Sequence, residues 1–211
     1  MGFTIENTME QLFMIIFDLD GTLADCEHRR HFVDPKKNPD YELVADYDND
    51  NCGCNRPGCL PLKWVHKLTG KRWKPDWKAF YEACHMDHPI YPVIDIMLRI
   101  DVPYQIWSAR CESVRQKTED WLLIHTKLMR SEMPEIKMRP IGDSTPDDEL
   151  KERWLNEFNH QGDGKCLLRW ANHSTCCKQI EMVFDDRKKV IEMWQSHGIF
   201  VFDVSQGKGD F

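Results

Sequence analysis

Two carboxylates stand two residues apart in the stretch Phe17-Asp18-Leu19-Asp20-Gly21-Thr22, which directly follows an apolar run. Cleavage of a phosphate ester requires a nucleophile, neutralisation of negative charge and a proton for the leaving oxygen. Asp18 can attack phosphorus, while Asp20 can protonate the leaving oxygen and later take a proton from water. Gly21 allows a sharp turn that exposes backbone N–H groups to a substrate phosphate. Two acids in a surface turn are the competing interpretation, which the apolar run and the Gly-Thr pair disfavour.

Short apolar runs predict the strands that must position these residues. The runs at 12–17, 103–107 and 180–184 stop at Asp18, Ser108 and Asp185, and each has the pattern of a strand buried on both faces. Ligands bind beyond the carboxyl ends of parallel strands, so these three residues should meet at one edge of a sheet. The remaining elements are weaker strands at 136–138 and 199–202 and periodic helices at 92–99, 113–129, 146–158 and 187–197.

Strands that alternate with helices predict an α/β fold, a Rossmann-like parallel sheet with helices on both faces. Residues 26–89 interrupt this alternation, since they are polar, rich in Pro, Gly, Asn and Asp, and show no clear strand. We therefore predict a core formed by residues 1–25 and 90–211, and a cap insertion at 26–89 over the active edge. A second, smaller insertion is predicted at 159–178.

The order of motifs resembles that of haloacid dehalogenase superfamily phosphatases. The matching positions are Asp18 and Asp20 for the first motif, Ser108 for the second, Lys151 for the third, and Asp185 and Asp186 for the fourth. The resemblance implies that Ser108 holds a phosphoryl oxygen and that Lys151 offsets the charge of nucleophile and phosphate. It also implies Mg²⁺ as cofactor, bound by Asp18, the backbone carbonyl of Asp20, and Asp185. Asp186 would support the metal through water or orient Lys151.

Further stretches resemble the phosphatase domain of bacteriophage polynucleotide kinases and its stand-alone relatives. They are Asp20 to Asp25, His28-Arg29, Met138-Arg139-Pro140, Gly142-Asp143, Asp185-Asp186-Arg187 and Val204 to Phe211. This resemblance implies a nucleotide or a nucleic-acid 3′ end as substrate. Two features depart from the family pattern: Ala109 replaces the usual glycine before Arg110, and 36–74 and 159–178 are longer. No Gly-x-x-x-x-Gly-Lys-Ser/Thr loop occurs, so no kinase domain is expected within this chain.

Arginines near the motifs are candidate phosphate ligands, because a guanidinium group matches the geometry of phosphate oxygens. Arg110 follows the second-motif hydroxyl, and Arg29 and Arg139 lie in the stretches that carry the narrower resemblance. For Arg139, a surface ion pair is an equally open interpretation. The tryptophans at 64, 73 and 77 could stack on a base, although buried packing is expected for at least two of them.

Cysteines in the predicted insertion could hold a structural zinc ion. Cys52, Cys54 and Cys59 form a compact thiolate cluster, with His66 as the nearest fourth ligand. Cys84 and His85 are further candidates, and free cysteines in the insertion are an equally open interpretation. For the second cluster, burial or coincidence is the favoured interpretation: Cys166, His173, Cys176 and Cys177.

Composition excludes several classes of protein. Hydrophobic residues make up 41% and charged residues 30%, the balance of a globular protein rather than a disordered or membrane one. No apolar run approaches the roughly 18–20 residues that span a bilayer, and the first residues lack a secretory pattern. A cytoplasmic location is therefore expected, in the host if the protein is viral. The net charge of −7 argues against sequence-independent coating of nucleic acid.

The sequence leaves several functions open. A phosphatase acting on a nucleic-acid 3′ end follows from the narrower resemblance. A 5′-nucleotidase-type enzyme for nucleoside monophosphates fits the acidic charge and a large insertion that closes over a small molecule. A nucleotide-binding module without catalysis is disfavoured, because all four motif positions are occupied. Asp20 disfavours a dehalogenase, which needs no such acid. The position of Asp18 on the first strand disfavours a receiver domain.

Overall fold

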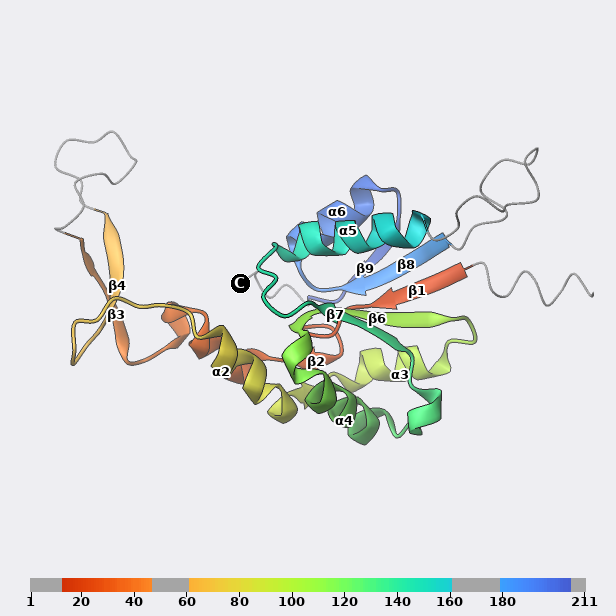
Figure 1. Cartoon of the computed structure of the whole chain (residues 1–211), viewed down its shortest axis with the longest axis horizontal. Coiled ribbons are helices and arrows are strands. Elements are labelled where there is room, and N and C mark those ends of the chain that lie inside the picture. The colour runs from red at the N-terminus through yellow and green to blue at the C-terminus, as the bar shows by residue number, and fades with distance from the viewer. Residues whose placement is uncertain (1–12, 47–60, 161–178, 206–211) are drawn as a thin grey trace, which may run out of the picture. The chain divides into compact units, whose positions relative to one another are not determined.

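The computed structural model describes residues 13–46, 61–160 and 179–205 of the chain (Figure 1). The chain divides into two compact units. The core unit comprises the described residues of Met1–Asp25 and Asp87–Asp210, and the inserted unit comprises those of Cys26–Met86. Among the described residues, no helix is long and apolar enough to cross a membrane.

The core unit is built on a five-stranded sheet in the order β7-β6-β1-β8-β9, in which every neighbouring pair is parallel. β1 occupies the centre, and four of its five residues are buried, as a continuous apolar run requires. This sheet confirms the predicted α/β fold. The strands are β1 (Phe13–Phe17), β6 (Tyr104–Cys111), β7 (Glu135–Arg139), β8 (Gln179–Asp185) and β9 (Phe200–Asp203).

Helices cover both faces of the sheet. Figure 1 shows α5 (Asp147–His160) and α6 (Lys188–Ser196) on one face, and α3 (Tyr91–Arg99) and α4 (Arg115–Thr126) on the other. Short 3-10 turns at Glu112–Val114 and Arg130–Glu132 adjoin α4. Gly198 has φ +74° directly after the end of α6, the left-handed conformation expected of a glycine that ends a helix.

Tryptophans fill the core between the sheet and the α5–α6 layer. Trp107 of β6 contacts Trp154 of α5 edge-on, with ring centroids 5.9 Å apart, and lies 5.7 Å from the ring of Trp194 of α6. All three side chains are buried. Because Trp107 precedes Ser108 and Trp154 lies one turn beyond Lys151, this packing fixes both elements that carry those residues.

The two connections to the inserted unit leave the core unit side by side. β2 (Ala24–Asp25) pairs antiparallel with β5 (His88–Pro89), so that Ala24 lies opposite Pro89 and Asp25 lies opposite His88. The backbone N–H of Ile90 also donates to the carbonyl of Leu23 at 2.8 Å. These pairings hold together the two chain positions between which the insertion is made.

The inserted unit contains a β-hairpin, so the prediction that residues 26–89 hold no clear strand was wrong. β3 (Tyr41–Ala45) and β4 (Leu62–His66) are antiparallel, with Leu43 opposite Trp64. Buried and exposed positions do not alternate cleanly along this hairpin, which explains the weak sequence signal. The unit also contains η1 (Glu27–Phe32), η2 (Pro35–Lys37), α2 (Trp77–Glu82) and η3 (Ala83–Met86).

Candidate active site

Three carboxylates converge at the carboxyl edge of the sheet. Asp18 follows β1, Asp185 ends β8, and Asp186 comes next in the chain. β1 and β8 are neighbouring parallel strands in which Phe17 pairs with Phe184, so both strands end at the same level. Asp18, Asp185 and Asp186 each place a carboxylate oxygen within 4.8 Å of the others. Asp18 and Asp185 therefore meet at this edge, as expected from the strand ends.

Lys151 reaches this cluster from the first turns of α5. Its Nζ donates to Asp18 Oδ1 at 2.5 Å and to Asp185 Oδ2 at 2.7 Å. The lysine, Asp18 and Asp185 are all buried. Burial alone would lower the pKa of Lys151, but the carboxylates of Asp18 and Asp185 outweigh burial and raise it. The lysine therefore stays charged and fixes the two acids side by side.

Negative charge in the cluster exceeds the charge that Lys151 supplies. Burial, and then the neighbouring Asp185 and Asp186, raise the pKa of Asp18 well above its ordinary value, although Lys151 acts in the opposite direction. Burial and Asp185 raise the pKa of Asp186 to about 7. Asp186 Oδ1 is buried and has no hydrogen-bond partner within the described parts of the chain. These three acidic side chains around one ammonium group fit a divalent cation with oxygen ligands such as Mg²⁺.

Gly21 makes room for Asp186. Its φ is +94°, and a Cβ atom built on it would lie 2.0 Å from Asp186 Oδ2, so no other residue fits without displacement. The backbone N–H of Gly21 donates to the carbonyl of Ala24 at 2.8 Å. This N–H is thus used within the turn, and the positive φ and the closeness of Asp186 are the features that require glycine.

Arg110 contacts Asp20. Its Nη2 forms an ion pair with Asp20 Oδ1 and another, at 2.7 Å, with Asp87 Oδ2. Its Nη1 donates to Thr118 Oγ1 of α4 at 3.2 Å, and its side chain is buried. Asp87 is itself buried, and its carbonyl accepts a hydrogen bond from Trp121 Nε1 at 2.8 Å. These contacts hold the guanidinium group of Arg110 against Asp20, and its expected contact with substrate phosphate stays a prediction.

Ser108 lies within β6 rather than just beyond it. The strand continues to Cys111, with a register shift against β7 between Ser108 and Cys111. Ser108 is buried, and its Oγ accepts a hydrogen bond from the backbone N–H of Arg110 at 3.2 Å. β6 is a parallel neighbour of β1, with Ile106 opposite Phe17, which puts Ser108 on the strand beside the one that leads to Asp18.

Arg139 is bound on every side by groups of the protein. Its Nε donates to the Ala109 carbonyl at 2.8 Å, its Nη1 to the Thr145 carbonyl at 2.5 Å, and its Nη2 to Asp147 Oδ1 at 2.5 Å. Arg187 pairs with the other oxygen of Asp147. These contacts favour the ion-pair interpretation of Arg139, which ties the end of β7 to the start of α5 ahead of Lys151.

Other candidates lie in the inserted unit or outside the described residues. Arg29 is buried there, with its guanidinium carbon 4.1 Å from the centroid of the Phe80 ring. His66 Nδ1 accepts a hydrogen bond from the Leu68 backbone N–H at 3.2 Å. Among the described residues, His66, Cys84 and His85 belong to no group of potential metal ligands. The remaining zinc candidates lie outside the described residues: Cys52, Cys54, Cys59, Cys166, His173, Cys176 and Cys177.

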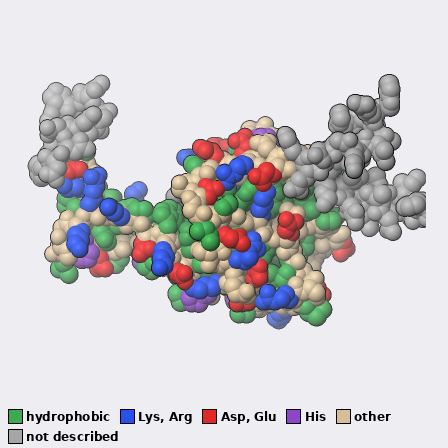
Figure 2. All heavy atoms as spheres, in the orientation of Figure 1, with side chains coloured by type: hydrophobic (Ala, Val, Ile, Leu, Met, Phe, Trp, Pro, Cys, Tyr) green, Lys and Arg blue, Asp and Glu red, His purple; other side chains and the backbone are tan. Residues whose placement is uncertain are grey.

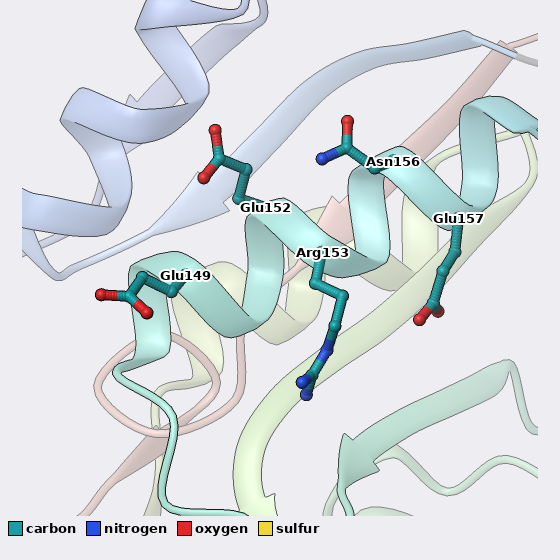
Figure 3. A pocket seen from close by; sticks show the side chains of 5 residues that line it. All are labelled: Glu149, Glu152, Arg153, Asn156 and Glu157. Carbon is teal, nitrogen blue, oxygen red and sulfur yellow. The ribbon is translucent and has the colours of Figure 1, made fainter.

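A hollow of about 440 Å³ lies along α5, and Lys151 is not among the residues that line it (Figure 3). Its side chains project from successive turns of one helix, and most of them are acidic. A surface of this charge repels a phosphate group, so we do not assign it to the site. The lining residues are Glu149, Glu152, Arg153, Asn156 and Glu157.

Solved structures share this fold. A chain of the Pnkp1/Rnl/Hen1 complex matches with a TM-score of 0.50 and 18% identity, over 95% of this chain and 47% of that one. A chain of the Pnkp1/Rnl/Hen1 RNA repair complex matches with a TM-score of 0.50 and 16% identity, over 92% of this chain and 42% of that one. The likeness is one of fold. It agrees with the fold implied by the resemblance to haloacid dehalogenase and polynucleotide kinase phosphatase domains.

This chain spans less than half the length of these two solved chains. No protein-family model and no curated protein matches its sequence. Two residues of the site were not predicted from the sequence. Asp87, the second partner of Arg110, stands in the short stretch Met86-Asp87-His88 without a motif. Arg187 was seen only as part of a matching stretch, and its pairing with Asp147 needed the fold.

Proposed function

We propose that this chain is a Mg²⁺-dependent phosphomonoesterase that uses Asp18 as its nucleophile. The observation that carries the proposal is Lys151, which donates to both Asp18 and Asp185 in a buried cluster that also contains Asp186. A nucleophilic carboxylate beside a fixed positive charge, with further acids for a divalent cation, is the set of groups that phosphoryl transfer requires.

The residues that would hold Mg²⁺ are Asp18, Asp185 and Asp186, together with the backbone carbonyl of Asp20. The fit rests on the buried Asp186 oxygen that lacks a partner among the described residues, and on the excess of carboxylates over ammonium groups. When bound, the ion would neutralise negative charge on the phosphoryl oxygens and so allow an anionic nucleophile to approach.

In the first step, a carboxylate oxygen of Asp18 attacks phosphorus and the bond from phosphorus to the leaving oxygen breaks. Protonated Asp20 gives its proton to that oxygen, which leaves as an alcohol. The product is an aspartyl-phosphate on Asp18. Lys151 offsets the charge of the attacking carboxylate and the phosphoryl group, and the Ser108 hydroxyl donates to a phosphoryl oxygen.

In the second step, water attacks the phosphorus atom of the aspartyl-phosphate. Asp20, now a carboxylate, takes a proton from this water, and the bond between Asp18 and phosphorus breaks. Inorganic phosphate leaves, and both aspartates return to their starting states. Because Asp20 must move a proton in each direction, its position matters in both steps. Arg110 supplies that position through its ion pair with Asp20, and Asp87 holds Arg110 through a second ion pair.

For the substrate, we propose a nucleotide or a nucleic-acid 3′ end that carries a phosphate. The motif resemblance to polynucleotide kinase phosphatase domains supports the polymer, and the fold matches a chain of an RNA repair complex. The net charge of −7 favours a nucleoside monophosphate instead, because a polyanion is repelled by an acidic protein. A 3′-phosphorylated oligonucleotide and a nucleoside monophosphate, compared for phosphate release at equal concentration, would decide between the two.

The proposal is tested with Asp18→Asn, which keeps the size of the side chain and removes the nucleophilic charge. We expect Mg²⁺-dependent phosphate release by the wild type, none above background in EDTA, and a loss of about 10⁴-fold or more in the variant. Acid-stable label on the wild-type protein after incubation with labelled substrate would show the aspartyl-phosphate. A variant that turns over at the wild-type rate would contradict the role of Asp18. A wild type that binds nucleotides without releasing phosphate would instead indicate a catalytically inactive binding module.

A further inference from the structure

The inserted unit carries a strongly basic segment, in contrast to the chain as a whole. The chain has a net charge of −7. The segment from Lys67 to Lys78, however, contains five basic residues and one acidic residue, Asp76. The segment runs from the end of β4 to the start of α2, and Figure 2 shows Lys and Arg side chains gathered around the β3–β4 hairpin. The five basic residues are Lys67, Lys71, Arg72, Lys74 and Lys78.

Most of this positive charge is not neutralised within the described part of the protein. All five basic residues are exposed, and Lys71, Lys74 and Lys78 form no ion pair with a described residue. Arg72 lies 4.0 Å from Asp46, a contact that is weak for a side chain exposed to 69%. Asp76 forms no ion pair with a described residue; its carboxylate accepts a hydrogen bond from the Ala79 backbone N–H and caps α2.

An exposed indole ring stands within the same segment. Trp77 is 48% exposed and lies in the sequence between Lys74 and Lys78. Its ring is held from within the unit, with its centroid 6.1 Å from the Tyr81 ring in a stacked arrangement and 5.7 Å from the Phe80 ring. Trp64 and Trp73 are less exposed. A fixed aromatic ring with a free surface, flanked by cations, is how proteins bind single-stranded nucleic acid without reading its sequence.

We propose that the Lys67–Lys78 surface binds single-stranded nucleic acid, with phosphates on the lysines and a base stacked on Trp77. An anionic lipid surface fits less well, because Leu68 is the one large aliphatic side chain in this segment and offers little apolar area for insertion. The proposal deepens the proposed function, on which its link to catalysis rests, because it makes a polynucleotide rather than a mononucleotide the substrate.

The surface is tested by the fluorescence anisotropy of a labelled single-stranded oligonucleotide without a 3′ phosphate, so that binding is measured apart from chemistry. The test variant is Lys71→Ala/Lys74→Ala/Lys78→Ala. The matched control removes three exposed lysines of the core unit, Lys127→Ala/Lys188→Ala/Lys189→Ala, and has the same net charge. We expect the test variant to bind about 10-fold or more weakly in low salt, and its log affinity to fall less steeply with log salt by about 2. The control should bind like the wild type.

Two further measurements make each outcome decisive. Trp77→Ala should weaken binding by about 5- to 100-fold, and Lys→Arg at the three test positions should restore it. Hydrolysis of p-nitrophenyl phosphate should be unchanged in the lysine variants, because this small substrate has no polynucleotide chain to bind the Lys67–Lys78 surface. Equal oligonucleotide affinity for the test and control variants would overturn the proposal, as would lysine-dependent binding to phosphatidylserine vesicles without binding to the oligonucleotide. A protein that binds the oligonucleotide through these lysines but hydrolyses nothing would retain the surface and refute the proposed function.

Discussion

The carboxylate site of the core unit and the Lys67–Lys78 surface of the inserted unit both concentrate charge, but in opposite ways. At the site, Lys151 is buried against Asp18 and Asp185 at 2.5 and 2.7 Å, so that both sides of the interaction are held within the protein. On the surface, Lys71, Lys74 and Lys78 are exposed and have no ion-pair partner within the described parts. Charges arranged in advance suit bond cleavage, whereas exposed charges of one sign suit a partner that brings the opposite sign.

The largest effect on stability is expected from removal of Lys151, the buried cation of the carboxylate site. Lys151→Met would leave two buried carboxylates without their cation, and we expect the free energy of unfolding in EDTA to fall by about 3–5 kcal/mol at pH 8. The loss should shrink at pH 5, because the raised pKa of Asp18 lets that acid take up a proton and lose its charge. Urea unfolding at both pH values measures the effect, and equal losses would argue against charge as its cause.

A smaller effect is expected at Asp87, which pairs with Arg110 and so helps to position Asp20. Asp87→Asn keeps the shape of the side chain and an oxygen acceptor for Arg110. It removes one of the two negative charges that pair with the Arg110 guanidinium group. We expect kcat to fall by about 10-fold with KM nearly unchanged, since only the orientation of Asp20 is affected. Exposed Asp95→Asn on α3 is the matched control and should keep the wild-type rate. A change confined to KM would instead indicate that Arg110 binds substrate.

Mg²⁺ should couple to pH through the same cluster. The pKa of Asp186 is about 7 in the metal-free protein, above its ordinary value of 3.8, so the folded chain holds a proton that the unfolded chain has lost between these values. Without metal, stability should therefore fall as pH rises from about 4 to 7. With the proposed function, Mg²⁺ would replace that proton, and its affinity should rise up to about 10-fold per pH unit below 7. Thermal melts with and without Mg²⁺ at pH 5.5 and 8 test this, and a shift in Tm independent of pH would contradict it.

The smallest effect is expected in the turn that follows β4. Leu68 is 92% exposed, and Leu68→Ser should change the free energy of unfolding by no more than about 0.5 kcal/mol. Hydrolysis of p-nitrophenyl phosphate should be unaffected. A marked destabilisation in urea would show that this turn is packed against part of the protein rather than open to a partner.

The sequence predicted the parts of the site that follow from strand ends. Asp18 and Asp185 were placed correctly because apolar runs mark buried strands, and parallel strands deliver their last residues to one edge. Lys151 required the motif resemblance, since helical periodicity alone does not show what its ammonium group contacts. Arg110 was predicted to bind substrate because a guanidinium group suits phosphate, and that role stays a prediction. Its ion-pair partners Asp20 and Asp87 lie 90 and 23 residues away in the chain, and no local pattern indicates such pairings.

The predictions were wrong where the local backbone conformation differs from what the pattern of apolar and polar residues indicates. The strand that leads to Ser108 was expected to stop there, yet it continues to Cys111 past a register shift. The β3–β4 hairpin was missed because its exposed and buried residues do not follow a period of two. In each case the deciding contact is between backbone groups, whose hydrogen bonds are largely independent of side-chain type.

The two-residue ribbon of β2 and β5 has a consequence for how such a chain can change. Asp25 and His88 lie opposite each other at the point where the inserted unit begins and ends. A segment grafted between two clamped ends can be lengthened, shortened or exchanged without moving the strands on either side, because the cost of closing the loop depends only weakly on its length. The sheet edge that carries Asp18 is thereby insulated from whatever is inserted, and a short turn in its place would leave that edge intact.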